Sequence, residues 1–209
     1  MPVFEPLFEP LAATSFSFLR GASQPDEMVW AAHGLGLKGL GVADVNNVAG
    51  VVRAHVAAKE AGIKLIVGSR LVDEGGFHTV IYPKNRATWG RLTSTLTKGN
   101  RRSKKGDCTL SRDDVLAAME GACAILVPPP VITPQWLDEA RYRIAHTPSS
   151  CDLYIAATRP FDGTDFARLT ILSELVKTSR IGKKTNFNSN PRLIATMDAL
   201  FHTPDRALL

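Results

Sequence analysis

The chain has 209 residues, 44% hydrophobic and 22% charged, which is enough for one buried α/β domain and excludes a disordered chain. No apolar run reaches the roughly 18 residues of a membrane span, the N-terminus lacks the basic residues of a signal peptide, and three widely spaced cysteines indicate neither a disulfide framework nor a zinc knuckle. We therefore expect a cytoplasmic protein with no membrane partner, whose net charge of +5 suits an anionic partner only where it is concentrated.

The N-terminal part predicts one strand and one helix. Residues 1–13 are rich in proline and apolar side chains, which is typical of an extended lead-in with a strand. The helix should run from about Pro25 to His33. Ser23 is its expected N-cap, with Asp26 three residues later, where a carboxylate can reach back to the cap.

The stretch 37–67 predicts a strand–helix–strand unit. An apolar run, Gly39–Ala43, precedes a helix that ends at Gly62, a residue suited to a left-handed terminus, and a second run, Ile63–Val67, follows. The predicted apolar face of the helix consists of Val48, Val51, Val52 and Val56. Parallel strands joined in this way collect functional side chains just past their carboxyl ends. The positions concerned are Asp44, Val45, Ser69 and Arg70.

The remainder alternates further strands and helices. Strands are predicted at 77–82, 122–127, 152–157 and 192–196. Helices are predicted around Trp89–Leu96, over 111–120, from about Gln135 and over Phe166–Val176, and a loop is predicted at 180–191. Ser111 is the expected cap of the helix at 111–120, with Asp114 three residues later. Six or seven strands alternating with helices are typical of a parallel barrel or a doubly wound sheet. We favour the barrel because acidic and polar groups follow several different strands.

The positive charge is concentrated between Lys98 and Asp107, a segment predicted as a loop. Its candidate nucleic-acid-binding residues are Arg101, Arg102, Lys104 and Lys105. Such a run is either a solvated surface or a contact with the phosphate backbone of DNA. No aromatic residue interrupts it, so it lacks a stacking platform for single strands.

A family pattern is carried by residues 16–23, 51–68, 126–129, 193–198 and 202–206. These stretches resemble the N-terminal PHP domain of bacterial C-family DNA polymerase III alpha subunits, and most of all the error-prone branch. The resemblance implies a distorted (β/α)7 TIM-like barrel, in agreement with the strand count. It also implies a single domain over 1–209 that forms the N-terminal part of a longer polymerase.

Active members of this superfamily hold two or three metal ions with His, Asp and Glu and hydrolyse phosphoesters through metal-activated water. Other residues occupy five of the ligand positions here: Leu11, Ala13, Val45, Arg70 and Leu200. The residual metal candidates are Asp44, Asp198, His78 and His202. The resemblance thus implies a degenerate metal site with no catalytic residue and no cofactor.

Two alternatives remain for the leftover carboxylates. In the first, the carboxylates are structural, and Asp44 pairs with Arg70 or is hydrogen-bonded within its turn. In the second, the carboxylates bind a divalent metal ion weakly, because two carboxylates without further ligands favour only weak binding of hard ions.

Three functions therefore compete. The first is a non-catalytic scaffold of an error-prone polymerase used in DNA repair, with the rest of the alpha subunit and other mutagenic-repair proteins as partners. The second is a metal-dependent phosphoesterase or 3′–5′ exonuclease, and the third is a stand-alone basic adapter for nucleic acid. Whether the chain alone is an enzyme is left open by the sequence.

Overall fold

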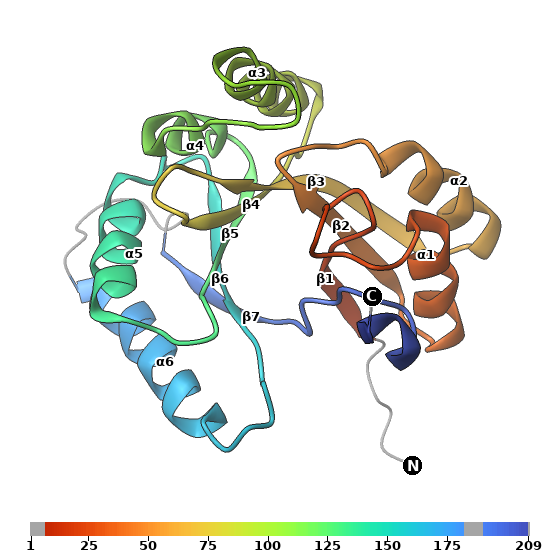
Figure 1. Cartoon of the computed structure of the whole chain (residues 1–209). Helices are drawn as coiled ribbons and strands as arrows, with labels where there is room; N and C mark the ends of the chain where they lie inside the picture. The colour runs from red at the N-terminus through yellow and green to blue at the C-terminus, as the bar shows by residue number, and fades with distance from the viewer. Residues whose placement is uncertain (1–6, 182–189, 209) are drawn as a thin grey trace. The chain divides into compact units, whose positions relative to one another are not determined.

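The computed structural model describes residues 7–181 and 190–208. Within those ranges seven strands form one sheet in the order β1-β2-β3-β4-β5-β6-β7, and helices separate most of them (Figure 1). The described residues divide into two compact units, one within Met1–Ser69 and Thr196–Leu209 and the other within Arg70–Ala195.

The first unit contains β1 (Phe8–Ala12), α1 (Pro25–Gly34), β2 (Gly39–Val45), α2 (Val51–Ala61), the start of β3 (Lys64–Val72) and the 3₁₀ helix η1 (Pro204–Leu208). β1 and β2 pair in parallel, and α1 and α2 lie side by side. Gly62 ends α2 in the left-handed conformation, as predicted, with φ of 69°. Met28, Val29, Leu40 and Val42 belong to the core that the two helices and two strands share.

The predicted apolar face of α2 is wrong. Val52 and Val56 are exposed, and Val48 precedes the helix, which begins at Val51. The buried positions are Ala54, Ala57, Ala58 and Ala61, which recur at helical spacing. Small side chains allow helices to approach their neighbours closely, so the alanines define the packed face and the valines face solvent.

The predicted N-cap of α1 is also wrong by one residue. Gln24 is the N-cap, and its backbone N–H donates to Glu27 Oε2 at 2.7 Å. Ser23 is fully buried, and its hydroxyl is held instead by His202, 179 residues away in the sequence. A long-range partner thus displaces the local capping role expected for this serine.

The second unit contains the end of β3, then β4 (His78–Tyr82), α3 (Arg86–Arg102), α4 (Arg112–Ala118), β5 (Cys123–Val127), α5 (Pro134–His146), β6 (Asp152–Ala157), α6 (Asp165–Ile181) and β7 (Arg192–Ala195). These elements confirm that the predicted strands and helices exist, although α3 extends to Arg102 and α6 to Ile181, beyond their predicted ends at Leu96 and Val176. Ser111 caps α4 and pairs with Asp114, as predicted. Of the predicted loop at 180–191, residues 182–189 lie outside the described residues.

The sheet is not wholly parallel. β4 pairs antiparallel with β5, from His78 opposite Val127 to Tyr82 opposite Cys123, whereas β5, β6 and β7 are parallel. The reason is the short connection after β3, because a tight turn reverses the chain where a helix would have preserved its direction. β3 is also longer than predicted, so Ser69 and Arg70 lie within the strand rather than past its end, and Asp44 likewise lies within β2.

The segment after β7 returns to β1. Ala13 N–H donates to Ala199 O at 2.9 Å, and Ala199 N–H donates to Leu11 O at 2.9 Å. Seven strands in sequence order, alternating with helices and followed by this bridge, confirm the predicted mixed α/β class and its (β/α)7 TIM-like pattern.

The segment from Lys98 onward is not all loop, contrary to the prediction, because α3 continues to Arg102. Gly99 lies in this continued part of the helix, where a Cβ would lie 2.6 Å from Cys108 Sγ, so the absence of a side chain lets the following loop pack closely on the helix. Arginines in the last turn also interact favourably with the helix dipole.

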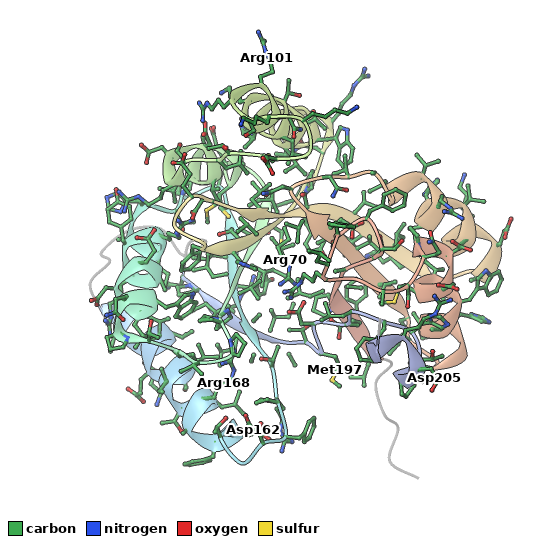
Figure 2. The ribbon with its side chains drawn as sticks, viewed as in Figure 1. Arg70, Arg101, Asp162, Arg168, Met197 and Asp205 are labelled. Atoms are coloured by element: carbon green, nitrogen blue, oxygen red, sulfur yellow. The ribbon has the colours of Figure 1, made fainter. Side chains whose placement is uncertain are left out.

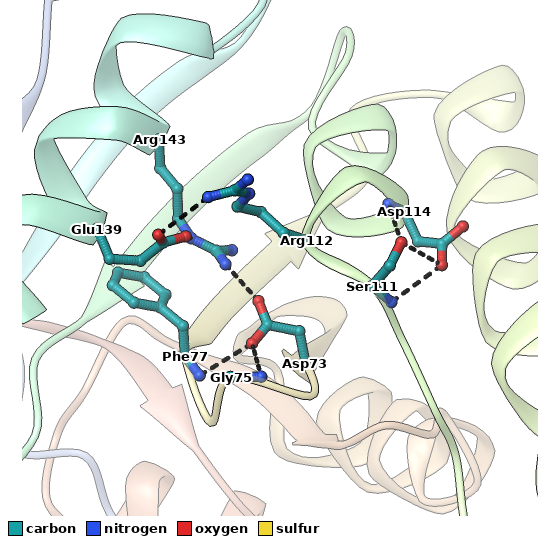
Figure 3. A network of polar contacts seen from close by, with 8 residues as sticks. All are labelled: Asp73, Gly75, Phe77, Ser111, Arg112, Asp114, Glu139 and Arg143. Atoms are coloured by element: carbon teal, nitrogen blue, oxygen red, sulfur yellow. Dashed lines mark hydrogen bonds and ion pairs between the residues drawn. The ribbon is translucent and has the colours of Figure 1, made fainter.

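Two buried arginines fix loops of the second unit. Arg168 of α6 donates through NH1 to the carbonyls of Pro129 and Pro130, at 2.8 and 2.9 Å (Figure 2). Arg143 of α5 bonds Asp73, and both side chains are only 2% exposed. Figure 3 shows how Asp73 also accepts the backbone N–H groups of Gly75 and Phe77, which shapes the turn between β3 and β4.

None of the helices in the described ranges is long and apolar enough to cross a membrane.

Candidate functional site

The two predicted ligand positions at the end of β1 and just after it carry no polar side chain. Leu11 and Ala13 are both fully buried. Their backbone groups form the bridge to Ala199, so this end of β1 now serves only as packing and as backbone pairing.

The carboxylate of Asp44, at the end of β2, is bound by residues of the loop after β1. Its carboxylate accepts hydrogen bonds from Thr14 N–H at 2.7 Å, from Thr14 Oγ1 at 2.9 Å and from Ser17 Oγ at 2.6 Å, and the residue is 2% exposed. Ser17 Oγ in turn accepts the backbone N–H of the half-buried Val45 at 3.0 Å. Asp44 is thus hydrogen-bonded, but by the loop after β1 and not within its own turn as expected.

Asp198, the second residual carboxylate, forms an ion pair. Arg20 NH2 lies 2.7 Å from its Oδ2, and the two side chains are 28% and 18% exposed. Asp198 adopts a left-handed backbone with φ of 50°, and its N–H donates to Thr196 Oγ1 at 3.0 Å. The guanidinium therefore offsets the negative charge of this carboxylate.

His202 binds a hydroxyl of the chain itself. Its Nδ1 lies 2.7 Å from Ser23 Oγ, and its backbone N–H donates to the same oxygen at 2.9 Å. Glu27 Oε2 lies 3.7 Å from Nδ1, and Glu27 Oε1 pairs with Arg206 at 3.0 Å. The half-buried Leu200 contributes its carbonyl, which accepts the N–H of Ala22 at 2.9 Å.

Glu9 is a member of this region that the sequence analysis missed. It is 7% exposed, and its carboxyl accepts Leu11 N–H and Met197 N–H, each at 2.8 Å, together with the hydroxyl of Thr196. Burial raises the pKa of the Glu9 carboxyl above its ordinary value of 4.5. The available signal was an acid inside the otherwise apolar run of the predicted first strand.

Backbone packing around Asp44 depends on two glycines. A Cβ on Gly21 would lie 2.0 Å from Thr14 O, and a Cβ on Gly50 would lie 3.0 Å from Asp44 Oδ2. The loop that carries Thr14 and Ser17 is therefore folded tightly on itself and on the carboxylate.

The residues of this unit do not fit a divalent metal centre of the PHP type. Two of the predicted ligand positions are apolar and buried, three donors engage the Asp44 carboxylate, and Arg20 neutralises Asp198. Transition-metal sites need several His or acidic groups directed at one point. In the part of the chain that the structure describes, no group of three or more His, Cys, Asp or Glu is arranged to hold a metal ion.

The other predicted site residues lie in the second unit. Arg70 is 1% exposed within β3, and His78 is half-buried at the start of β4. The contact between Arg70 and Asp44 stays a prediction. Arg101, Lys104 and Lys105 are exposed at the end of α3, whereas Arg102 pairs with Asp114.

Residues 12–129 match the protein family described as the PHP domain. The chain is 40% identical over 199 residues to error-prone DNA polymerase 1 of Rhizobium meliloti (strain 1021), a match that covers 92% of this chain and 16% of the relative. It is 38% identical over 200 residues to the error-prone DNA polymerase of Caulobacter vibrioides, covering 93% of this chain and 17% of the relative. The chain thus spans about a sixth of the length of these relatives, and it matches their N-terminal region.

Solved structures share the fold. A protein assigned as a metal-dependent phosphoesterase from Bifidobacterium adolescentis superposes with a TM-score of 0.64 at 14% identity, covering 95% of this chain and 88% of that one. An amidohydrolase from Chromobacterium violaceum superposes with a TM-score of 0.58 at 15% identity, covering 94% and 88%. Together with the family match over more than half of its length, these similarities show that the chain belongs to the PHP domain family.

Proposed function

We propose that this chain is a non-catalytic PHP scaffold and the N-terminal part of an error-prone DNA polymerase alpha subunit. In that role it serves DNA-directed DNA synthesis in damage tolerance and repair, in the cytoplasm. The similarity to error-prone polymerases supports the assignment to this kind of protein. The observation that carries the non-catalytic part is the Asp44 carboxylate, which donors of the chain itself engage.

The former site acts as a set of internal links. Asp44 joins the end of β2 to the loop after β1, and the Arg20–Asp198 pair joins that loop to the segment after β7. Charge-assisted hydrogen bonds of this kind are directional and roughly twice as strong as neutral ones. They hold in place backbone that active relatives would organise around metal ions, so the shape of the domain is retained without hydrolytic chemistry.

The same two segments present apolar side chains to solvent. Phe18 is 87% exposed, Leu19 is 92% exposed and Met197 is 71% exposed. Leu19 has a left-handed backbone, with φ of 59°, which only a well-determined loop sustains. These exposed apolar side chains are consistent with a protein partner. We propose the remainder of the alpha subunit as that partner, with other mutagenic-repair proteins as further candidates.

The test is an assay of hydrolysis. The purified chain should release no phosphate from phosphoesters and no nucleotide from the 3′ end of DNA, in the presence of Zn²⁺ or Mn²⁺. Circular dichroism and cooperative unfolding must show that the same preparation is folded. Hydrolysis that a chelator abolishes and added metal restores would favour the alternative, a metal-dependent phosphoesterase or exonuclease.

A further inference from the structure

Four exposed cations lie at the end of α3 and directly after it. We define the α3 tip as Lys98, Arg101, Lys104 and Lys105, all exposed. Among the described residues no carboxylate pairs with any of the four, and Figure 2 shows Arg101 extending away from the helix. The neighbouring arginines are neutralised instead, in the pairs Arg91–Glu120, Arg102–Asp114 and Arg112–Glu139.

The backbone that carries the α3 tip is fixed. Ser103 Oγ accepts the N–H of Thr109 at 2.8 Å and donates to the Gly99 carbonyl at 3.0 Å. Thr109 N–H also bonds Gly99 O at 3.2 Å, and Gly99 packs directly on the side chains of Cys108 and Leu110. The loop after α3 is therefore closed onto the helix, and its lysines project from an ordered backbone.

We infer that the α3 tip binds the phosphate backbone of duplex DNA. Lys98 and Arg101 lie three residues apart, on one side of the helix, and Lys104 and Lys105 follow directly beyond its end. Asp107 is the single acid between Lys98 and Thr109. Because none of the four cations pairs with a carboxylate of residues 7–181 or 190–208, none must break such a pair in order to contact a phosphate.

The chemistry of the α3 tip also specifies the mode of binding. The segment from Lys98 to Thr109 contains no aromatic residue on which a base could stack. Contact with phosphates alone carries no sequence information. The site therefore takes duplex DNA without sequence preference, which is a property separate from the proposed scaffold role and independent of metal.

The experiment is a titration of two unrelated labelled 20-base-pair duplexes with the purified chain at several salt concentrations. Four phosphate contacts give a slope of log affinity against log salt near −3.6, so affinity should fall about 150-fold between 50 and 200 mM salt. Both duplexes should give the same slope and the same affinity.

Two variants with the same change of net charge show whether DNA binding depends on the α3 tip or only on the net charge of the chain. Replacing the α3 tip, by Lys98→Gln, Arg101→Gln, Lys104→Gln and Lys105→Gln, should bring the slope close to zero. The control replaces four exposed lysines elsewhere, by Lys38→Gln, Lys59→Gln, Lys64→Gln and Lys177→Gln, and should keep the slope of the parent. Circular dichroism checks that both variants are folded.

Three results would overturn the inference. The first is no detectable binding by the parent chain at 50 mM salt. The second is an equal loss of slope in both variants, which would mean that net charge alone drives binding. The third is binding to vesicles of anionic phospholipid, but not to duplex DNA, that depends on the α3 tip.

Discussion

Replacing Asp44 by alanine distinguishes a structural carboxylate from a metal ligand. The variant leaves the buried N–H of Thr14 without its acceptor. It also removes the acceptor of two hydroxyl groups, those of Thr14 and Ser17. Hydrogen bonds to a charged group contribute about 1.5–3 kcal/mol each. The hydroxyl of Ser17 keeps its bond from Val45 N–H, so the loss falls toward the low end of their sum. We expect a loss of about 4–5 kcal/mol in the free energy of unfolding.

The assay is thermal and urea unfolding in buffer that contains a chelator. For a chain of this size the midpoint should fall by about 2–4 °C for each kcal/mol, or roughly 10 °C in all. Asp138→Ala is the matched control, because the side chain of Asp138 is 78% exposed and its pair with Arg141 lies at the surface. The control should change the free energy of unfolding by less than about 0.5 kcal/mol.

The opposite result has a clear meaning. In a metal site without its metal, neighbouring carboxylates repel one another, so removing one leaves stability unchanged or raises it. A midpoint of Asp44→Ala that equals or exceeds that of the parent in chelator would therefore refute the structural role of this residue.

Two further predictions concern buried charge. Arg143→Met leaves the carboxylate of Asp73 buried without its cation and should lower the free energy of unfolding, measured in urea, by about 3–5 kcal/mol. The control Arg141→Met changes an exposed residue and should lower it by under about 1 kcal/mol. Equal effects of the two variants would contradict the role of the buried pair. Burial raises the pKa of Glu9 above 4.5, so the stability it contributes is fully present below pH 4.5 and is lost as the pH rises through the raised pKa. Glu9→Gln cannot ionise, so the parent should lose stability relative to this variant between pH 4.5 and neutral pH, and a difference that does not change with pH would contradict the burial of an ionisable group.

Much of the fold could be predicted from periodicity and breakers. Asp152–Ala157 is a strand as predicted, and Gly62 ends its helix as predicted. The buried face of α2 could not be predicted from hydrophobicity alone, because alanines pack where close approach matters more than apolar area. The antiparallel direction of β4 depends on the short turn between β3 and β4, and the number of predicted strands does not reveal the length of that turn.

The candidate site was predictable in part. The resemblance to the family singled out Leu11, Ala13 and Asp44, but not the groups that bind the Asp44 carboxylate. Arg20 and Asp198 are 178 residues apart in the sequence, so their pairing arises only from the fold. Likewise Arg102 looked equivalent to Arg101, and only the position of Asp114 beside it separates a neutralised arginine from an available one.

The metal content of the purified chain tests the central claim most directly. The protein would be expressed with zinc and manganese in the medium, purified by gel filtration without chelator, and measured by elemental analysis against protein concentration. A degenerate site predicts far less than one zinc or manganese ion per chain. Two or more tightly held transition-metal ions per chain, lost on treatment with a chelator and regained in stoichiometric amounts, would contradict it.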